Sequence, residues 1–316
     1  MAMKIAIIGT GLAGLATGWF LSRLGSRVTF FDKKGIGRGA SGVAAGLLHP
    51  YVGEQTRPSL WAEEATAESK ALIQQVSSKS ILEKGIVRIA QNDEQRKALQ
   101  SYSDVQPLGD SRFLIKSGLV IDTKGYLQAL FTATGAELII EEIENDQSLQ
   151  HFDRILVAAG HEADGFLPQY KSFVNKKKGQ LLDIHLKEPM PSTIAKGYLA
   201  KGIDSYHWGS TYENSYESEL PDPKTALAIL EKNEFPFTSS LEIVGCRAGV
   251  RLTRKGHYVP IATKIEKKIW WFGALGSRGL LYHAYLGRKM AEAMLRDDPE
   301  LLPKECRIRC KQNCSS

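Results

Sequence analysis

The glycines of Gly9-Thr-Gly11-Leu-Ala-Gly14 constrain the fold of this chain most, because they lie between a short apolar run and a helical one. Lys4–Ile8 is too short for a helix and predicts a buried strand, whereas Leu12–Leu24 predicts a helix that ends before a glycine. In such a motif the first glycine permits a tight turn and the second lets the backbone approach a pyrophosphate. The third glycine lets the helix pack closely on the strand.

A second predicted strand, Arg27–Phe31, ends on Asp32, which lies 18 positions beyond Gly14. A carboxylate at that point can accept a hydrogen bond from a ribose hydroxyl. The N-terminus of the preceding helix offers unpaired N–H groups and the positive end of its dipole to phosphates. We therefore predict dinucleotide binding; the alternative is a glycine-rich turn in an ordinary α/β unit.

The stretch Gly39–Gly46 consists mostly of Ala, Gly and Ser, so its backbone can approach a flat or charged group closely. A nicotinamide-binding domain would continue with another helix and a third hydrophobic strand. An extended track of small residues instead favours a flavin with its ribityl chain. Because the first turn is suited to a pyrophosphate, we predict FAD rather than FMN.

The remaining pattern predicts an α/β protein: an interrupted Rossmann-like FAD-binding domain with an inserted, mainly antiparallel β-sheet substrate domain. Ile155–Ala159 is expected to return to the first sheet, and Phe113–Ile121 to form a hairpin that turns near Lys116-Ser-Gly118. The other predicted strands are Gly85–Ala90, Glu137–Ile140, Gly179–His185, Gly197–Ala200, Tyr206–Tyr212, Leu241–Val250 and Ile269–Phe272. The predicted helices are Ser59–Ser77 with Ser59 as N-cap, Asp93–Tyr102, Asp122–Thr134, Pro223–Asn233 and Gly279–Leu295. We assign 1–78, 120–170 and 245–298 to the FAD-binding domain, 79–119 and 171–244 to the substrate domain, and 299–316 to a basic C-terminal tail.

Composition and charge set broader limits. A hydrophobic content of 43% and a charged content of 24% are typical of a globular protein. The first strand begins at Lys4 and is too short to span a bilayer, so we expect a cytoplasmic protein without an integral membrane segment. The net charge is +6, and basic residues gather at Lys176–Lys178, Lys264–Lys268 and Lys304–Lys311. Such runs are typical of solvated surface, and they also suit an anionic partner such as RNA.

The four cysteines do not predict a metal site. Cys306, Cys310 and Cys314 recur at helical spacing, but no fourth ligand or Cys-x-x-Cys pair accompanies them. We interpret them as part of a floppy basic tail, and we interpret Cys246 as a buried strand thiol.

Several motifs together resemble the D-amino-acid oxidase family of FAD-dependent oxidoreductases, which includes glycine oxidase and sarcosine oxidase. They are the N-terminal fingerprint, G-A-S-x-x-A-A-G-L from Gly39, I-L-V-A-A-G from Ile155, G-Q-L from Gly179, R-A-G-V-R-L-T at 247–253 and L-G-S-R-G-L at 275–280. The last two also resemble the oxidase domain of the bifunctional tRNA wobble-uridine modification enzyme. The methyltransferase domain that accompanies it there is not in this sequence.

The resemblance implies hydride removal from the carbon between an amine and a carboxylate, with flavin N5 as acceptor. Arg251 matches the arginine that clamps the substrate carboxylate, a task that suits the planar, permanently charged guanidinium. A structural salt bridge is the alternative, since Arg247 and Arg254 are close in sequence. Tyr198, 11 residues before Gly209, matches a substrate-facing tyrosine, although an ordinary sheet tyrosine also fits. His207 and Tyr212 are weaker candidates on the same predicted sheet.

The resemblance also implies a cofactor site. Gly276–Leu281 would bring a helix N-terminus to the flavin pyrimidine edge, where it favours the anionic reduced flavin. Arg278 would add a positive charge or face water, and His49 would contact the flavin, bond to backbone or tether the cofactor covalently. Lys255-Gly256-His257 stands where relatives carry an acidic residue, which leaves the substrate open. The predicted cofactor-binding residues are Gly9, Gly11, Leu12, Ala13, Gly14, Asp32, Lys33, Ala40, Ser41, Ala45, Gly46, Leu47, Ile143, Ala159, Gly160, Gly276, Arg278, Gly279, Leu280 and Leu281.

From these observations we predict an FAD-dependent amine or amino-acid oxidase or dehydrogenase. Its substrate would be a small amino acid or an N-substituted glycine, whose imine product is then hydrolysed. One alternative is removal of the carboxymethyl group from a modified wobble uridine, which would make tRNA the partner. Another is a flavin-binding subunit without turnover. Nothing in the sequence favours DNA as a partner.

Overall fold

The structure is a computed structural model that describes residues 2–308 of the 316-residue chain. The described chain forms two compact units, each with its own sheet. The first contains residues up to Arg38, Leu130–Lys176 and the described residues from Arg251 onward; the second contains Gly39–Ala129 and Lys177–Val250. The units divide the chain at other residues than the domains expected from the sequence. Residues 39–78, 120–129 and 245–250 lie in the second unit, and residues 171–176 lie in the first.

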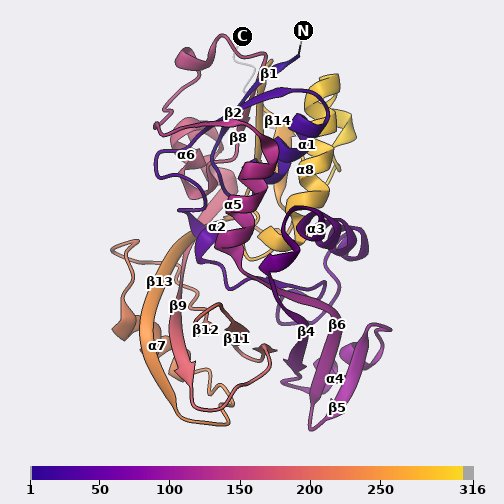
Figure 1. Cartoon of the computed structure of the whole chain (residues 1–316), viewed down its shortest axis with the longest axis vertical. Helices are drawn as coiled ribbons and strands as arrows, with labels where there is room; N and C mark the ends of the chain where they lie inside the picture. Colours follow the sequence, from indigo (N-terminus) through magenta and orange to yellow (C-terminus); the bar gives the residue numbers. More distant parts are fainter. Residues whose placement is uncertain (1, 309–316) are drawn as a thin grey trace. The chain divides into compact units, whose positions relative to one another are not determined.

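The first unit is built on a six-stranded sheet with the order β14-β15-β8-β1-β2-β7 (Figure 1). All neighbouring strands are parallel except β14, which is antiparallel to β15. The pairing of β8 with β1 confirms that the segment around Ile155 returns to the first sheet. The strands are β1 (Lys4–Ile8), β2 (Arg27–Phe31), β7 (Glu137–Ile139), β8 (Arg154–Val157), β14 (Ile261–Lys264) and β15 (Ile269–Gly273).

Helices α1 (Leu12–Arg23) and α8 (Gly279–Arg296) pack against each other in the first unit, and Figure 1 shows them side by side. Small residues allow this approach: a Cβ on Gly287 of α8 would lie 3.2 Å from the Cβ of Ala16 in α1. The unit also contains α6 (Ala163–Phe166) and the short 3-10 helices η2 (Gln147–Leu149), η3 (Gly160–Glu162), η4 (Pro168–Phe173) and η5 (Pro299–Leu301).

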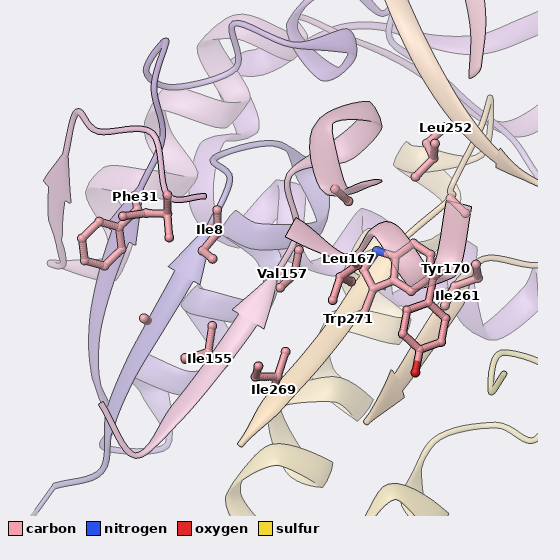
Figure 2. Close-up of a cluster of buried hydrophobic side chains, with 14 of the residues drawn as sticks. Ile8, Phe31, Ile155, Val157, Leu167, Tyr170, Leu252, Ile261, Ile269 and Trp271 are labelled. Carbon is pink, nitrogen blue, oxygen red and sulfur yellow. The ribbon is translucent and has the colours of Figure 1, made fainter. Parts of the chain in front are cut away.

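A cluster of buried apolar side chains covers one face of this sheet, and Figure 2 shows most of its members. Alternate residues of the central strands supply it, as expected for strands whose successive side chains point to opposite faces. Ile8, Ile155 and Val157 come from β1 and β8, while Trp271 lies on β15 beside Tyr170 of η4.

The described part of the C-terminal segment is packed rather than floppy, so the predicted loose tail is wrong for residues 299–308. Cys306 is fully buried, its carbonyl accepts a hydrogen bond from Ala262 N–H of β14, and Leu302 is also buried. Burial raises the pKa of the Cys306 thiol to about 12. Cys310, Cys314 and Lys311 lie outside the described residues.

The second unit is built on a nine-stranded sheet with the order β13-β9-β12-β11-β10-β4-β6-β3, and β5 pairs with β6. Its pairs are antiparallel where register is given, except the parallel pair of β10 and β4. The strands are β3 (Leu47–Leu48), β4 (Ile81–Ile89), β5 (Val105–Gly109), β6 (Arg112–Ile121), β9 (Val174–Leu186), β10 (Thr193–Ile194), β11 (Tyr198–Lys201), β12 (Tyr206–Gly209) and β13 (Leu241–Arg254). The first residues of β9 and the last residues of β13 belong to the first unit. The helices are α2 (Ala40–Val43), α3 (Ala62–Ser77), η1 (Ser78–Ser80), α4 (Asp93–Gln100), α7 (Pro223–Glu231) and α5 (Thr123–Thr134), whose last residues belong to the first unit.

The predicted hairpin near Lys116-Ser-Gly118 is wrong, because β6 runs uninterrupted through these residues. The turn-forming residues serve another purpose there: Lys116 N–H and the Ser117 hydroxyl both donate to Asp104. The hairpin of this region instead joins β5 to β6 at Asp110 and Ser111, which both have positive φ.

Two further expectations differ in detail. The small-residue stretch from Gly39 is not a wholly extended track, because Ala40–Val43 form the short helix α2. Helix α3 begins at Ala62, with Trp61 in the left-handed region as its N-cap. Ser59 contributes only its carbonyl, which accepts from Ala62 N–H in the preceding turn. None of the helices within residues 2–308 is long and apolar enough to cross a bilayer.

Close packing of α1 on β2 generates a first prediction. A Cβ at Gly18 would lie 2.3 Å from the ring of Phe30, which is fully buried. We expect Gly18→Ala to lower the free energy of unfolding by about 1–3 kcal/mol in urea denaturation. Gly165→Ala is the matched control, since nothing lies within 4 Å of its Cβ position. Equal stability of the two variants would contradict this packing.

Candidate active site

The first β–α turn of the first unit can hold only glycine at two points. Gly9 has φ +108°, and a Cβ there would lie 2.4 Å from the carbonyl oxygen of Ala158. A Cβ on Gly14 would lie 2.0 Å from the carbonyl oxygen of Gly9. The turn therefore sits directly on the backbone that follows β8, where Ala159 and Gly160 begin the next turn.

Helix α1 begins without a capping side chain. Gly11 is its N-cap, no side chain caps it, and no acidic residue lies in its first turn. The first N–H groups of a helix have no intrahelical acceptor and lie at the positive end of its dipole. This end of α1 therefore suits an anion such as a phosphate.

Asp32 lies at the end of β2, beside this turn. Its carboxylate accepts hydrogen bonds from Thr10 N–H at 2.9 Å and the Thr10 hydroxyl at 2.8 Å, and from the N–H groups of Lys34 and Gly35. These four donors fix the position of the Asp32 carboxylate. A ribose hydroxyl that bonded to it would compete with them for the same two oxygens. The Thr10 hydroxyl can rotate away, so its place is the one that a ribose hydroxyl can take.

Two other predicted cofactor residues have protein partners in the structure. Lys33 pairs with Glu142 at 2.6 Å and with Glu162 at 3.3 Å. Its hydrogen bond to Glu142 raises the pKa of Lys33 above its ordinary value against the opposing effect of burial, and Glu162 adds to the rise. Ile143 is buried in the apolar cluster on the first sheet.

The N-terminus of α8 lies beside that of α1, because a Cβ on Gly279 would be 3.0 Å from Leu12. Gly276, with φ +55°, leads into this helix and donates its N–H to the Leu252 carbonyl of β13. Like α1, α8 has neither a side-chain cap nor an acidic residue in its first turn. The Arg278 guanidinium lies 4.7 Å from the ring centre of the exposed Tyr258.

In the second unit, the small-residue segment packs on the sheet at backbone distance. A Cβ on Gly249 of β13 would lie 3.1 Å from Ala40 Cα, so Gly249 lets α2 approach the strand. A Cβ on Gly46 would lie 1.9 Å from the Ile121 carbonyl oxygen, and Gly46 accepts a hydrogen bond from Ile121 N–H. Ala45 and Leu47 face the apolar cluster of this sheet, which contains Leu181 and Ala200.

Tyr198 lies on the same face of the sheet as that cluster. It pairs with Gly209 of β12, and a Cβ on Gly209 would lie 3.0 Å from the Tyr198 hydroxyl oxygen. The tyrosine ring therefore crosses over Gly209 along the sheet surface. His49, for which the sequence left several roles open, is buried directly after β3.

The three arginines of β13 divide into different environments. Arg247 donates from Nε and Nη2 to both oxygens of Asp183, at 3.0 and 2.6 Å, and His207 Nδ1 lies 2.8 Å from the same carboxylate. Arg254 donates to the carbonyls of Glu305 and Arg307. Arg251 shares a face of β13 with Arg247, because side chains alternate along a strand. The structure thus assigns structural ion pairing to Arg247.

Asp183 and His207 were not linked to Arg247 by any local pattern, since the three residues lie on separate strands. Burial alone would raise the pKa of Asp183, but hydrogen bonds from His207 and Arg247 and the charge of Arg247 hold it below its ordinary value. Register could have found the pair of Asp183 and His207, which lie directly opposite each other on β9 and β12.

The basic runs are less exposed than expected. Lys178 is buried and donates to the Leu220 carbonyl, Lys177 bonds to Asn214 beside the Tyr212 ring, and Lys176 pairs with Asp164 at 3.0 Å. Within the second run, Lys264 pairs with Asp297. Most of these charges have partners within the chain.

A glycine turn at a helix N-terminus, between the first two strands of a parallel sheet, is typical of a dinucleotide-binding domain. Residues 4–293 match the family described as DAO, FAD dependent oxidoreductase, and the chain belongs to this family. The glycine turn and the N-terminus of α1 fit the diphosphate of FAD, the cofactor of the family.

Comparison with solved structures gives the same fold. Glycine oxidase from Geobacillus kaustophilus superposes with a TM-score of 0.78 over 98% of this chain and 99% of its own, at 18% identity. Iminodiacetate oxidase from Chelativorans sp. BNC1 gives a TM-score of 0.73 over 95% and 97%, at 20% identity.

Among curated proteins, the chain is similar to the tRNA 5-methylaminomethyl-2-thiouridine biosynthesis bifunctional protein MnmC of Idiomarina loihiensis. The two are 24% identical over 322 residues, which cover 87% of this chain and 53% of the relative. The MnmC of Campylobacter jejuni serotype O:2 is also 24% identical, over 84% of this chain and 47% of its own. The chain therefore spans about half the length of these relatives.

The shared carboxylate of Asp183 generates a second prediction. Because its pKa is depressed in the folded state, its stabilising effect is present above the ordinary Asp pKa of about 3.9 and is lost as the pH falls through the folded value. We expect Asp183→Asn to lower the free energy of unfolding by roughly 1–3 kcal/mol at pH 7. The difference from wild type should shrink below about pH 4 in urea titrations at several pH values.

The control for this prediction is Asp110→Asn, which alters an exposed carboxylate 3.6 Å from Arg112. Exposed pairs contribute little, so stability should scarcely change at any pH. A loss in Asp183→Asn that stayed constant from pH 7 to pH 3 would show that the depressed pKa does not govern it.

Proposed function

We propose that this chain oxidises the C–N bond of a small amino acid or an N-substituted glycine. The observation that carries the proposal is the Tyr198 ring, which covers Gly209 on the sheet face that also carries the small-residue segment at Gly249. An aromatic wall with a hydroxyl suits a small amine stacked against a flat ring. The glycine oxidase and iminodiacetate oxidase folds support this substrate class.

FAD, when bound, would supply the acceptor for a hydride from the carbon next to the substrate nitrogen, and water would hydrolyse the resulting imine. In this proposal Gly9, Gly11 and Gly14 admit the diphosphate, and Asp32 accepts from a ribose hydroxyl. In the same proposal the positive end of the α8 dipole would favour negative charge on the flavin. The other predicted cofactor residues keep the roles that their motif positions imply.

Arg251 is proposed to hold the substrate carboxylate. Its two neighbouring arginines have evident structural work, Arg247 with Asp183 and Arg254 with backbone carbonyls. Arg251 precedes the residues of β13 that pair with the loop before α8, through the bridge of Thr253 with Leu275. A guanidinium at that point can bind a carboxylate through two parallel hydrogen bonds.

Replacement of Arg251 tests this role. Lys keeps the charge but cannot reproduce the planar pair of donors, so we expect Arg251→Lys to raise the KM for a carboxylate substrate on the order of tenfold to a hundredfold. The flavin content should stay at the wild-type level. Arg254→Lys is the matched control and should leave KM unchanged. Normal turnover by Arg251→Lys would assign the arginine a structural role.

A second candidate function is removal of the carboxymethyl group from modified wobble uridine in tRNA. The similarity to MnmC over most of this chain favours it. The engagement of Lys176 and Lys178 by protein partners weakens it, because a phosphate-binding surface needs accessible charge. The modified uridine and the N-substituted glycines of the first candidate share the glycine unit that reacts. They differ in the second substituent on the nitrogen.

Anaerobic flavin bleaching separates these candidates. We expect glycine, sarcosine or a D-amino acid to bleach the flavin with little dependence on salt. Bulk tRNA from cells that lack the later modification step should leave it oxidised. Bleaching by tRNA alone, with a steep fall as salt rises, would favour the tRNA reaction, since each phosphate contact adds about one power of salt concentration. No bleaching by any amine or tRNA would favour a flavin-binding subunit without turnover.

A further inference from the structure

Arg88 of β4 is a buried cation with almost no internal partner. The residue is 5% exposed, and Nη2 donates one hydrogen bond of 3.3 Å to the Gly53 carbonyl. Its Nε is buried without a hydrogen-bond partner. None of the carboxylates within residues 2–308 forms a salt bridge with it.

The position of this charge is energetically costly. A guanidinium carries five N–H donors, and a buried charge without a partner loses hydration that one neutral carbonyl does not replace. Burial lowers the pKa of Arg88 to about 10, and the charge of the exposed Glu54 opposes this only in part. Arg88 therefore calls for a negative charge in direct contact with it.

A second buried donor lies under the same loop. Thr56 is 1% exposed, and its hydroxyl has no hydrogen-bond partner. Its N–H donates to the Gly53 carbonyl at 3.4 Å, so Thr56 and Arg88 converge on one oxygen atom. Both distances exceed the usual N–H···O range of about 2.7–3.2 Å. The Gly53 carbonyl is thus a weak acceptor for two donors, and the same two residues carry two further donors that have none.

The loop can turn at Gly53 while its two sides stay fixed. Gly53 has φ +108° and no side chain, so its carbonyl can change direction at little steric cost. On one side the Tyr51 hydroxyl donates to Asp104, and on the other Gln95 Nε2 of α4 donates to the Glu54 carbonyl at 2.6 Å. A ligand can therefore replace the Gly53 carbonyl between Arg88 and Thr56 without release of the loop.

The neighbours of Arg88 in the sheet restrict the kind of ligand. Arg88 lies opposite Ile194 of β10 on one side and Phe113 of β6 on the other, and both are buried. Residues directly opposite each other project from the same face, so two apolar side chains flank the arginine. Ile194 also separates it from Tyr198. A ligand here has to be small and singly charged, because a larger polar molecule would have groups without partners against these side chains.

We propose that Arg88 and Thr56 bind a chloride ion beneath the turn at residues 53–56. A monatomic anion can accept from the guanidinium and the hydroxyl at once, and its charge neutralises that of Arg88. The ion would join β4 to the loop 49–61, which leads from β3 to α3. This inference goes beyond the proposed oxidation and does not depend on it, because the ion contacts none of the residues assigned to that reaction.

Urea unfolding of the FAD-loaded protein at rising chloride concentration tests the site. A ligand that binds only the folded state raises the folding equilibrium constant about tenfold for each tenfold rise in ligand above its dissociation constant. We expect this rise in the wild type and its loss in Arg88→Met. Arg112→Met is the matched control, since Arg112 is an exposed arginine on the neighbouring strand β6. It should respond like the wild type and so account for general effects of salt.

Two further variants keep the test sharp if Arg88→Met fails to fold. Thr56→Val keeps the shape of the side chain and removes its hydroxyl, so it should weaken chloride roughly tenfold. Glu54→Gln removes a negative charge that opposes the anion, so it should tighten chloride by about threefold or more. In crystals soaked in bromide, an anomalous peak should lie within hydrogen-bonding distance of Arg88 Nε.

Equal chloride responses in the wild type and Arg88→Met would overturn the inference, as would bromide-soaked crystals with no anomalous peak at Arg88. Chloride binding that appears only in Glu54→Gln would show that the Glu54 carboxylate is the partner of Arg88 in the wild type, which also rejects the ion. Formate is the last probe. A response to formate without one to chloride or bromide would assign a carboxylate site instead and contradict the proposal.

Discussion

The tightest backbone approach in the first unit is that of Gly14 to Gly9. A Cβ on Gly14 would lie 2.0 Å from the Gly9 carbonyl oxygen. This contact fixes the start of α1 directly above the end of β1. Because Gly9 also lies against Ala158, the same turn sets the position of the backbone that follows β8. The N-terminus of α1 is therefore positioned by backbone packing.

Helices α1 and α8 both begin beside this turn. Leu12 and Gly279 bring the first turns of α1 and α8 together, and neither helix has a side-chain cap. A protein that needed only stability would satisfy these donors with Ser, Thr, Asp or Asn. The positive ends of two helix dipoles therefore adjoin, and Arg278 at the N-cap of α8 adds its charge, which suits a ligand with negative charge along its length.

Local patterns in the sequence predicted the parts of this fold that depend on local chemistry. The β1–α1–β2 unit, α8 and the return of β8 follow from glycine spacing and apolar runs. The false hairpin near Ser117 arose because turn-forming residues there bond to Asp104 of a neighbouring segment. Arg88 gave no signal, since one arginine in a strand normally marks a solvent-facing position. The group of Asp183, His207 and Arg247 spans 64 residues and depends on sheet register, which no local window contains.

The ion pair of Arg247 with Asp183 also acts on the edge of the larger sheet. β13 is the outermost strand there, next to β9, and it exposes Ile243 and Val244. A slip of one residue would turn Arg247 toward the apolar face that holds Trp208 and Leu182, where no carboxylate would meet it. The pair thus makes the misaligned edge strand unstable, and it protects an apolar edge from alternative pairing during folding.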